Sequence, residues 1–404
     1  MEKRVICLML ALLSVFCVPI YAQNDALIAP VNAETVNYQQ ITSTASENVL
    51  IENDARSLIL IEAETGTVLY EQDADLALPP ASVTKVMTML LVMEAIDSGM
   101  ITYDEAVTVS AYAANMGGSQ VYLEEGEQMT VHEMLKCVVV SSANDACVAL
   151  AEHIAGSEEA FVARMNERAR ELGMEHTNFE NTNGLDDDTV NHVISARDIA
   201  IMSAELITKH PKILEYSSIW MDSIRGGSFG LTNTNRLIRF YNGANGLKTG
   251  STSKAKFCIS ASAKRNGMQL ICVVMGAQTR DSRNETAKKL FDYGFANYAY
   301  ESFSGAQAAK ITEIPITGAM QSTIPLSFGS FETVVDKQNS GKIEAQVVLP
   351  EKLSAPIKQG QQVGKVVYSL NGETLATVPI TAAKGAKRIT FAQIFGRLLD
   401  AFWF

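Results

Sequence analysis

The spacing of apolar positions in the first third of the chain predicts a strand hairpin followed by a helix. Residues 57–63 are almost continuously apolar, and the turn signal at 64–66 returns the chain as a second strand. The run after Pro79-Pro80 contains no Gly or Pro until Gly99. These prolines mark the start of a helix, because the first turn of a helix does not use the N–H that proline lacks.

Further along, helical patterns give way to strands. Thr130 and Glu133 form the capping box of one helix, and residues 101–130 are expected to hold loops and short strands. Apolar runs on either side of the turn signal at 264–267 predict a second hairpin. This order of elements predicts an α+β domain, a sheet flanked by helices. Other helices are expected from Asp145 and over 158–172, 195–209 and 285–298, and the hairpin strands over 257–263 and 268–275.

From about residue 304, short strand patterns replace the helical ones. Turns such as Asn371-Gly372 separate these patterns, which predict a small all-β domain over 303–385. The expected strands are 310–316, 322–328, 343–349, 362–370 and 374–381.

The last stretch, 390–404, has apolar residues at the spacing of one helix face. It is too short to span a bilayer, but it can lie flat in a membrane interface with cations near anionic headgroups. Residues 386–404 are therefore predicted to be an amphipathic, membrane-anchoring helix. Docking on the protein itself or on a second copy is the alternative. The apolar face consists of Phe391, Ile394, Phe395, Leu398, Leu399 and Phe402, and the cations are Lys384, Lys387 and Arg388.

The N-terminus has the parts of a secretory signal. A basic start precedes an apolar run over 5–20, and Ala22 offers a small residue for cleavage. This predicts a signal peptide over 1–22, with an uncleaved anchor as the alternative. The polar, aperiodic residues 23–50 predict a flexible linker. The protein is therefore expected to be exported, to the outer face of the cytoplasmic membrane or the cell-wall compartment.

Composition argues against some classes of function. The formal net charge is -12, and an acidic exported chain is not expected to bind nucleic acid. The cysteines beyond the signal lie in apolar segments and are expected to be buried thiols. Cysteine and histidine spacing does not match a zinc site, so no metal or other cofactor is expected. The cysteines concerned are Cys137, Cys147, Cys258 and Cys272.

The stretch with candidate chemistry is Ser82-Val-Thr-Lys85, at the start of the predicted helix. Residues three apart share one face of a helix, so Lys85 would stand beside Ser82. A serine hydroxyl needs an adjacent base to become a nucleophile, and a lysine with a lowered pKa can be that base. Ser-x-x-Lys also begins at Ser251 and Ser253, so the pattern alone decides little.

Two further motifs give Ser82 a context. Ser142-Ala-Asn144 lies at a junction between predicted helices, and Lys248-Thr-Gly250 leads into a predicted strand. The order Ser-x-x-Lys, Ser-x-Asn, Lys-Thr-Gly resembles that of class A β-lactamases and penicillin-binding proteins.

The sequence resembles the low-molecular-mass penicillin-binding proteins that are serine-type D-alanyl-D-alanine carboxypeptidases. All three motifs match this family in longer blocks, and the resemblance spans about 56–295, extending more loosely to the β domain and the tail. It implies a β-lactamase/transpeptidase-like domain over 51–302, with a five-stranded antiparallel sheet and helices on both sides. The blocks are 81–88, 142–150 and 245–252, with further likeness at 181–185, 274–276 and Arg283.

The resemblance also implies catalytic roles for the motif residues. Ser82 would attack the carbonyl between two D-alanines, and Lys85 would take the serine proton. Ser142 would relay a proton to the leaving amine, and Asn144 would hold Lys85 and the substrate amide. Lys248 would lower the pKa of Lys85 by like-charge repulsion.

Substrate binding is implied for the third motif and one arginine. The backbone N–H groups of Ser82 and Ser251 would form an oxyanion hole. Thr249 and Arg283 would bind the terminal carboxylate, since arginine can bind a carboxylate bidentately. Thr234 stands where some relatives have arginine, which leaves Arg283 as the better candidate. Lys248 and Gly250 complete the predicted substrate-binding set.

The resemblance implies that peptidoglycan stem peptides ending in D-Ala-D-Ala are the substrates and that β-lactams are covalent inhibitors. A β-lactamase on the same fold is one alternative, although no clear Glu-x-x-x-Asn element lies between the second and third motifs. A catalytically silent cell-wall-binding protein is another. The motifs do not distinguish hydrolysis from cleavage of cross-links or from peptide transfer.

Overall fold

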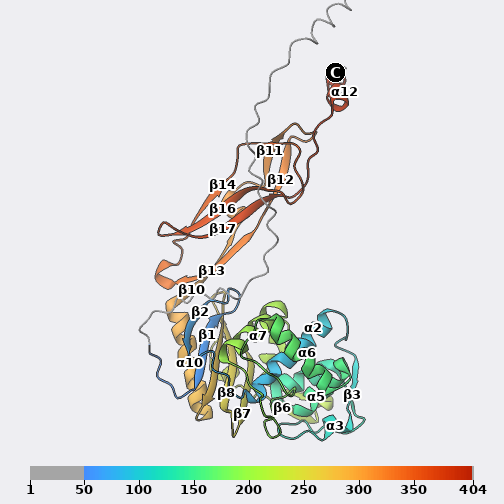
Figure 1. Cartoon of the computed structure of the whole chain (residues 1–404), viewed down its shortest axis with the longest axis vertical. Coiled ribbons are helices and arrows are strands. Elements are labelled where there is room, and N and C mark those ends of the chain that lie inside the picture. Colours follow the sequence, from blue (N-terminus) through green and yellow to red (C-terminus); the bar gives the residue numbers. More distant parts are fainter. Residues whose placement is uncertain (1–49, 403–404) are drawn as a thin grey trace, which may run out of the picture. The chain divides into compact units, whose positions relative to one another are not determined.

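A five-stranded antiparallel sheet with the strand order β2-β1-β9-β8-β7 forms the centre of the first domain (Figure 1). The computed structural model describes residues 50–402, so the predicted signal peptide and nearly all of the predicted linker lie outside the described residues. The implied sheet is confirmed. Its strands are β1 (Ser57–Glu62), β2 (Val68–Gln72), β7 (Ala244–Thr252), β8 (Lys256–Arg265) and β9 (Met268–Ala277).

Helices cover both faces of this sheet because its inner strands are apolar on both sides. Alternate residues of β9 enter two separate cores, with Val273 in one and Val274 in the other. Helix α10 (Arg280–Asn297) packs on one face, and α7 (Ala196–Lys209) packs on the other (Figure 1). Continuous apolar strands of this kind are typical of a sheet buried between layers.

The larger layer is mostly helical and contains two small strand pairs. The capping box of Thr130 and Glu133 is formed, as predicted. The layer includes the short helices η1 (Ala81–Thr84), η2 (Cys137–Ser141, a π-helix) and η3 (Arg225–Gly227). Its α-helices besides α7 are α2 (Lys85–Asp97), α3 (Ala111–Ala114), α4 (Val131–Lys136), α5 (Asn144–Ala155), α6 (Glu158–Glu171) and α8 (Ile213–Ser217). The short helix α9 (Leu237–Phe240) instead buries Leu237 in the core on the α10 face. The strand pairs are β3 (Ala106–Thr108) with β4 (Gln128–Thr130), and β5 (Met221–Ile224) with β6 (Phe229–Thr232).

Helices α10 and α3 differ from the sequence prediction, and both differences arise at helix caps. Helix α10 begins at Arg280 rather than at residue 285, because the Thr279 side chain caps it together with Ser282. The short helix α3 interrupts a segment predicted as loops and strands, and the Ser110 hydroxyl accepts the Ala113 N–H at its start.

The C-terminal part contains a six-stranded sheet with the order β14-β16-β17-β12-β11-β15 and a separate pair, β10 with β13. Its core includes Ile324, Tyr368 and Ile380, all fully buried. The five predicted strands are present, and β10, β13 and β15 were not predicted. The strands are β10 (Tyr298–Ser304), β11 (Glu313–Thr317), β12 (Thr323–Phe328), β13 (Ser330–Asp336), β14 (Glu344–Val348), β15 (Leu353–Ser354), β16 (Gln362–Leu370) and β17 (Glu373–Ala382), and the short helices are α11 (Gly305–Ala309) and η4 (Lys337–Asn339).

The last described element is helix α12 (Phe391–Phe402), which agrees with the predicted amphipathic helix. Its large apolar side chains between residues 391 and 399 are exposed, with Phe391 at 82% and Phe395 at 53%. Among residues 50–402, no helix combines the length and apolarity that crossing a membrane would require.

The four cysteines beyond the predicted signal peptide are all buried free thiols, as expected. They are Cys137, Cys147, Cys258 and Cys272.

Candidate active site

Ser82 and Lys85 lie side by side, as their spacing predicts, but at the junction of two helices rather than within one. Ser82 lies in η1, and Lys85 is the first residue of α2. The Lys85 Nζ is 3.0 Å from the Ser82 Oγ. Ser82 is half-buried, whereas Lys85 is fully buried. The serine is therefore the more accessible member of the pair.

Lys85 has three hydrogen-bond partners and no carboxylate among them. Besides the Ser82 hydroxyl, its Nζ reaches the Asn144 Oδ1 at 2.6 Å and the Asn183 backbone carbonyl at 2.8 Å. Burial lowers the pKa of Lys85 to about 8. A neutral amine donates two hydrogens and keeps one lone pair. Donating to the two carbonyl oxygens would aim that lone pair at the Ser82 hydroxyl, the geometry of a general base.

Lys248 is a second buried lysine close to the first. It lies on β7, and its Nζ donates to the Thr249 carbonyl at 2.9 Å. Burial, followed by the charges of Lys85 and Arg283, holds the pKa of Lys248 well below its usual value. Burial is the main cause of the lowered pKa of Lys85. The predicted like-charge repulsion contributes instead to Lys248, whose pKa is lowered by the charge of Lys85.

The second motif lies where η2 passes into α5. Ser142 adopts a left-handed conformation (φ 63°) between these helices and is almost fully buried. Asn144 begins α5, and its Oδ1 accepts from Lys85 as expected. The Asn144 Nδ2 donates to the Gly117 carbonyl at 2.7 Å, so one amide hydrogen already has a partner within the protein.

Asn183 belongs to the site but was not assigned a role from the sequence. The Asn183 backbone carbonyl accepts from Lys85. The neighbouring Thr182 donates its N–H and its hydroxyl to the Glu158 carboxylate, which holds this segment in place. A buried lysine needs acceptors for its hydrogens. The resemblance of residues 181–185 to the family could have pointed to this segment. The contact itself could not be predicted, because any residue type has a backbone carbonyl.

The third motif lies beside the nucleophile because Gly250 has no side chain. A Cβ at this position would come within 2.8 Å of both the Ser82 nitrogen and the Pro80 carbonyl. The Thr249 hydroxyl donates to the Thr234 hydroxyl at 2.8 Å, and Ser251 is exposed at the end of β7. The three motifs therefore converge on Ser82.

Arg283 lies in the first turns of α10 and is almost fully buried. Its Nη1 donates to the Cys258 carbonyl at 3.3 Å, and its Nε and Nη2 donate to the Asn284 Oδ1. Burial lowers the pKa of Arg283 to about 10. A bond to a substrate carboxylate would have to replace these internal bonds, so the predicted role of Arg283 stays a prediction.

The other two Ser-x-x-Lys patterns lie at the turn between β7 and β8. Ser251 and Ser253 are exposed, and the Lys254 Nζ donates to the Asp186 carbonyl. Neither serine has a buried lysine as its partner.

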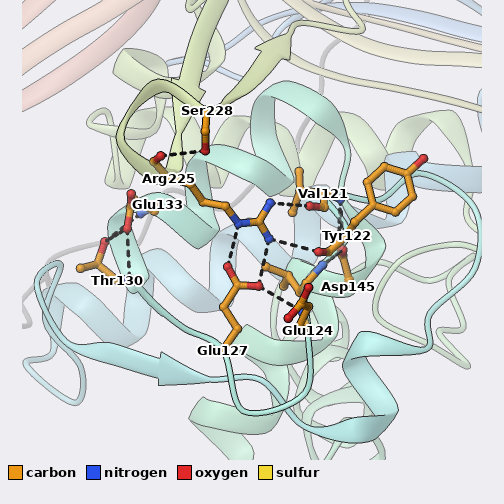
Figure 2. Close-up of polar contacts among 10 residues, drawn as sticks. Val121, Tyr122, Glu124, Glu127, Thr130, Glu133, Asp145, Arg225 and Ser228 are labelled. Atoms are coloured by element: carbon orange, nitrogen blue, oxygen red, sulfur yellow. Dashed lines mark hydrogen bonds and ion pairs between the residues drawn. The ribbon is translucent and has the colours of Figure 1, made fainter.

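A loop over 117–127 borders the Asn144 side of the site and is held by charged side chains. Figure 2 shows the Arg225 guanidinium between the Glu127 carboxylate and the Val121 and Tyr122 carbonyls, at 2.7 to 3.1 Å. The Asp145 carboxylate accepts the Val121 N–H at 3.1 Å. We call this group the Arg225 clamp. It fixes the loop whose Gly117 carbonyl holds Asn144.

Comparisons with known proteins match both parts of the chain. A family model described as D-alanyl-D-alanine carboxypeptidase matches residues 41–279, and one described as the C-terminal domain of penicillin-binding protein 5 matches residues 301–388. The chain is 41% identical to the D-alanyl-D-alanine carboxypeptidase DacF of Bacillus subtilis, over 86% of this chain and 90% of that protein. It is 34% identical to DacC of Escherichia coli, over 86% and 87%.

Solved structures agree. Penicillin-binding protein 5 from Haemophilus influenzae is 32% identical, with a TM-score of 0.71 over 84% of this chain and all of that one. Penicillin-binding protein D2 from Listeria monocytogenes, in its ampicillin-bound form, is 32% identical, with a TM-score of 0.57 over 61% of this chain and all of that one.

Proposed function

The chain belongs to the D-alanyl-D-alanine carboxypeptidases of the penicillin-binding protein family, and on that premise we propose how its own residues carry out the reaction. The enzyme is a serine-type carboxypeptidase. Ser82 is the proposed nucleophile and Lys85 its general base. The observation that carries this assignment is the placement of the Lys85 Nζ among the Ser82 hydroxyl and two carbonyl oxygens.

Acylation begins when the Ser82 Oγ attacks the carbonyl carbon of the penultimate D-alanine. Lys85 takes the hydroxyl proton as the new C–O bond forms. With a pKa of about 8 for Lys85, about one-tenth of the molecules hold the neutral amine at pH 7. Burial of Lys85 thus supplies a base that an exposed lysine could not.

The tetrahedral intermediate carries a negative charge on the former carbonyl oxygen. The backbone N–H groups of Ser82 and Ser251 would donate to it, and each such donor can contribute roughly 3 kcal/mol to the transition state. The close approach of Gly250 to the Ser82 nitrogen supports this pairing, because it brings the end of β7 alongside the nucleophile.

Collapse of the intermediate breaks the C–N bond and releases the terminal D-alanine. Ser142 would pass a proton to the departing amine, and Asn144 would hold Lys85 and contact the substrate amide. Thr249, with Lys248, Gly250 and Arg283 nearby, would receive the terminal carboxylate. Water then hydrolyses the acyl-enzyme on Ser82. The proposed substrates are peptidoglycan stem pentapeptides, and β-lactams would acylate the same serine.

The proposed location is the outer face of the cytoplasmic membrane. The predicted signal peptide over 1–22 would export the chain, and helix α12 would then lie in the membrane interface. Exposure of the apolar side chains of Phe391, Phe395 and Leu398 supports this role, since water is a poor environment for an apolar stripe. Peptidoglycan outside the membrane would be within reach of an enzyme anchored in this way.

The assignment of Ser82 is tested by mass spectrometry after brief exposure of the purified protein to benzylpenicillin. We expect a stable penicilloyl adduct on Ser82, none in Ser82→Ala, and an undiminished adduct in Ser253→Ala. The last variant removes the serine of another Ser-x-x-Lys pattern and so controls for mutation itself. Release of D-alanine from a diacetyl-L-lysyl-D-alanyl-D-alanine peptide should be lost in parallel in Ser82→Ala.

Two other outcomes would contradict this proposal. Rapid turnover of benzylpenicillin without an accumulating adduct would indicate a β-lactamase. Absence of any reaction in the unmutated protein would leave a catalytically silent cell-wall-binding protein.

A further inference from the structure

The peptide bond that precedes the nucleophile is held in an uncommon conformation. Ala81 has a φ of +49°, a left-handed value that alanine rarely adopts, and its side chain is buried. The carbonyl of Ala81 and the N–H of Ser82 belong to the same planar peptide unit. Whatever fixes the direction of the Ala81 carbonyl therefore also fixes the direction of the Ser82 N–H.

Two contacts fix the Ala81 carbonyl. The Thr84 hydroxyl donates to it at 2.9 Å. The backbone of Gly184 packs against it so closely that a Cβ on Gly184 would lie 1.8 Å from the carbonyl oxygen. The oxygen thus has a polar partner on one side and a packed backbone, which only glycine permits, on the other.

The Thr84 hydroxyl is in turn oriented by a buried histidine. The His192 Nε2 lies 2.8 Å from the Thr84 Oγ1, and the His192 Nδ1 accepts the Glu180 N–H at 3.0 Å. Because Nδ1 is an acceptor, the neutral ring carries its hydrogen on Nε2. That hydrogen is donated to Thr84, whose single hydroxyl hydrogen is left for the Ala81 carbonyl.

These bonds form a directed chain from the Glu180 N–H through His192 and Thr84 to the Ala81 carbonyl. A ring with the other tautomer would draw the Thr84 hydrogen to itself and leave the Ala81 carbonyl without this donor. Burial lowers the pKa of His192 to about 4, so the ring is neutral at the pH at which the chain must be in place.

We infer that His192 is a positioning residue for the oxyanion hole: through Thr84 it holds the Ala81–Ser82 peptide so that the Ser82 N–H points at the reacting carbonyl. The inference rests on the proposed function, in which Ser82 is the nucleophile and its N–H an oxyanion donor. His192 itself touches neither the substrate nor Ser82.

The test uses variants that break or preserve the chain of bonds. Thr84→Val has nearly the same shape as threonine but no hydroxyl, whereas Thr84→Ser keeps the hydroxyl. His192→Phe keeps a ring of similar size without either nitrogen. We expect Thr84→Val and His192→Phe to lower the second-order rate of acylation by benzylpenicillin about tenfold or more, and Thr84→Ser to stay within about threefold.

An infrared measurement separates misorientation from general loss of stability. With the β-lactam carbonyl labelled with carbon-13, the ester carbonyl stretch of the acyl-enzyme reports the hydrogen bonds that this oxygen accepts. We expect a shift to higher frequency in Thr84→Val and His192→Phe. Phe179→Leu is the matched control. The Phe179 ring packs edge-on against the His192 ring, with 5.9 Å between the ring centroids, but lies outside the chain of bonds. It should lower the melting temperature and leave the frequency unchanged.

Failure of this inference can be told apart from failure of the proposed function. If the unmutated protein forms the Ser82 adduct, and Thr84→Val and His192→Phe match it in acylation rate and carbonyl frequency, the positioning role is wrong while the catalytic assignment stands. If the unmutated protein forms no Ser82 adduct, the proposed function itself is wrong.

Discussion

A lysine buried without a carboxylate partner is unusual, and its neighbours explain how Lys85 is tolerated. Desolvation penalises the ammonium form, so such a group either finds strong partners or loses its proton. Lys85 does both in part: two carbonyl oxygens accept its hydrogens, and burial lowers its pKa to about 8. The charge of Lys85 also helps to lower the pKa of Lys248, after burial.

This lowered pKa predicts how acylation depends on pH. Lys85 is active as the neutral amine, so the rate should rise with pH, about tenfold per unit below pH 8, and level off above it. The measurement is the second-order rate of acylation by benzylpenicillin between pH 5.5 and 9.5. We expect Lys85→Arg to fold but to lose acylation, because arginine stays protonated throughout this range.

A rate that still rises about tenfold per unit up to pH 9.5, as expected for an exposed lysine with a pKa near 10.4, would contradict the idea that burial prepares Lys85 as the base. So would Lys85→Arg with the acylation rate of the unmutated protein.

At the scale of elements, the loop over 117–127 connects a surface ion pair with the catalytic centre. Arg225 holds this loop through Glu127 and two backbone carbonyls (Figure 2). The Gly117 carbonyl at the start of the loop holds Asn144. The hydrogen bonds from Arg225 hold the pKa of Glu127 below its usual value. This contribution to stability is present above the unfolded-state pKa of Glu127 and is lost as the pH falls through the lowered pKa.

We predict that Arg225→Ala lowers both stability and acylation. Loss of the clamp should reduce the free energy of unfolding by about 1–3 kcal/mol. Displacement of Asn144 should slow acylation by about tenfold, because small misplacements of catalytic groups greatly reduce the reaction rate. Arg225→Lys keeps a charge beside Glu127 but not the forked guanidinium, so an intermediate effect is expected. Thermal unfolding and the benzylpenicillin acylation rate measure the two effects.

Arg168 provides the matched control. Arg168 joins the carboxylates of Glu94 and Glu205, each at 2.7 Å, and its side-chain exposure of 22% is similar to the 26% of Arg225. Arg168→Ala should lower stability comparably and leave acylation unchanged. An equal loss of acylation in both variants would show that the Arg225 clamp acts through stability alone.

At the scale of the whole molecule, the chain joins a catalytic domain to a β-sheet domain and an exposed amphipathic helix. The apolar residues of α12 keep 43% to 82% of their surface exposed. These residues are Phe391, Ile394, Phe395, Leu398 and Leu399. Covering this face with lipid would recover the free energy that its exposure to water loses.

We predict that Leu398→Glu weakens binding to phosphatidylglycerol vesicles by about tenfold or more, because a buried leucine contributes about 1.5–3 kcal/mol. Flotation of the purified protein with vesicles measures this binding. D-alanine release from a soluble peptide should be unchanged.

Gln393→Glu is the matched control for the added charge. The Gln393 Oε1 accepts from the Thr390 N–H, a capping bond that glutamate can also make. This variant should therefore bind vesicles more strongly than Leu398→Glu does. If neither variant affects vesicle binding but Leu398→Glu converts a dimer to a monomer, the face is an interface between two copies.

Much of the fold could be predicted because local patterns record burial. Strands β1 and β9 lie where the apolar runs over 57–63 and 268–275 predict them. Helix α4 begins at the predicted Thr130–Glu133 cap. The start of α10 was misplaced because the cap at Thr279 uses Ser282 where glutamate or glutamine is usual. Strand β13 was missed because Val334 and Val335 are adjacent and both buried, which breaks the apolar-polar alternation that indicates a strand.

Local sequence was enough to specify most of the elements, the buried thiols and the three motifs that meet at Ser82, because period and motif order depend on neighbouring residues. Packing alone decided what surrounds them. Lys85 finds its other acceptors 59 and 98 residues away, and Thr84 meets His192 across 108 residues. The lowered pKa of Lys85 depends on burial, and the orientation of the Ser82 N–H depends on a chain of hydrogen bonds. Both are properties of folded surroundings, because desolvation and hydrogen-bond direction arise only when distant segments come together.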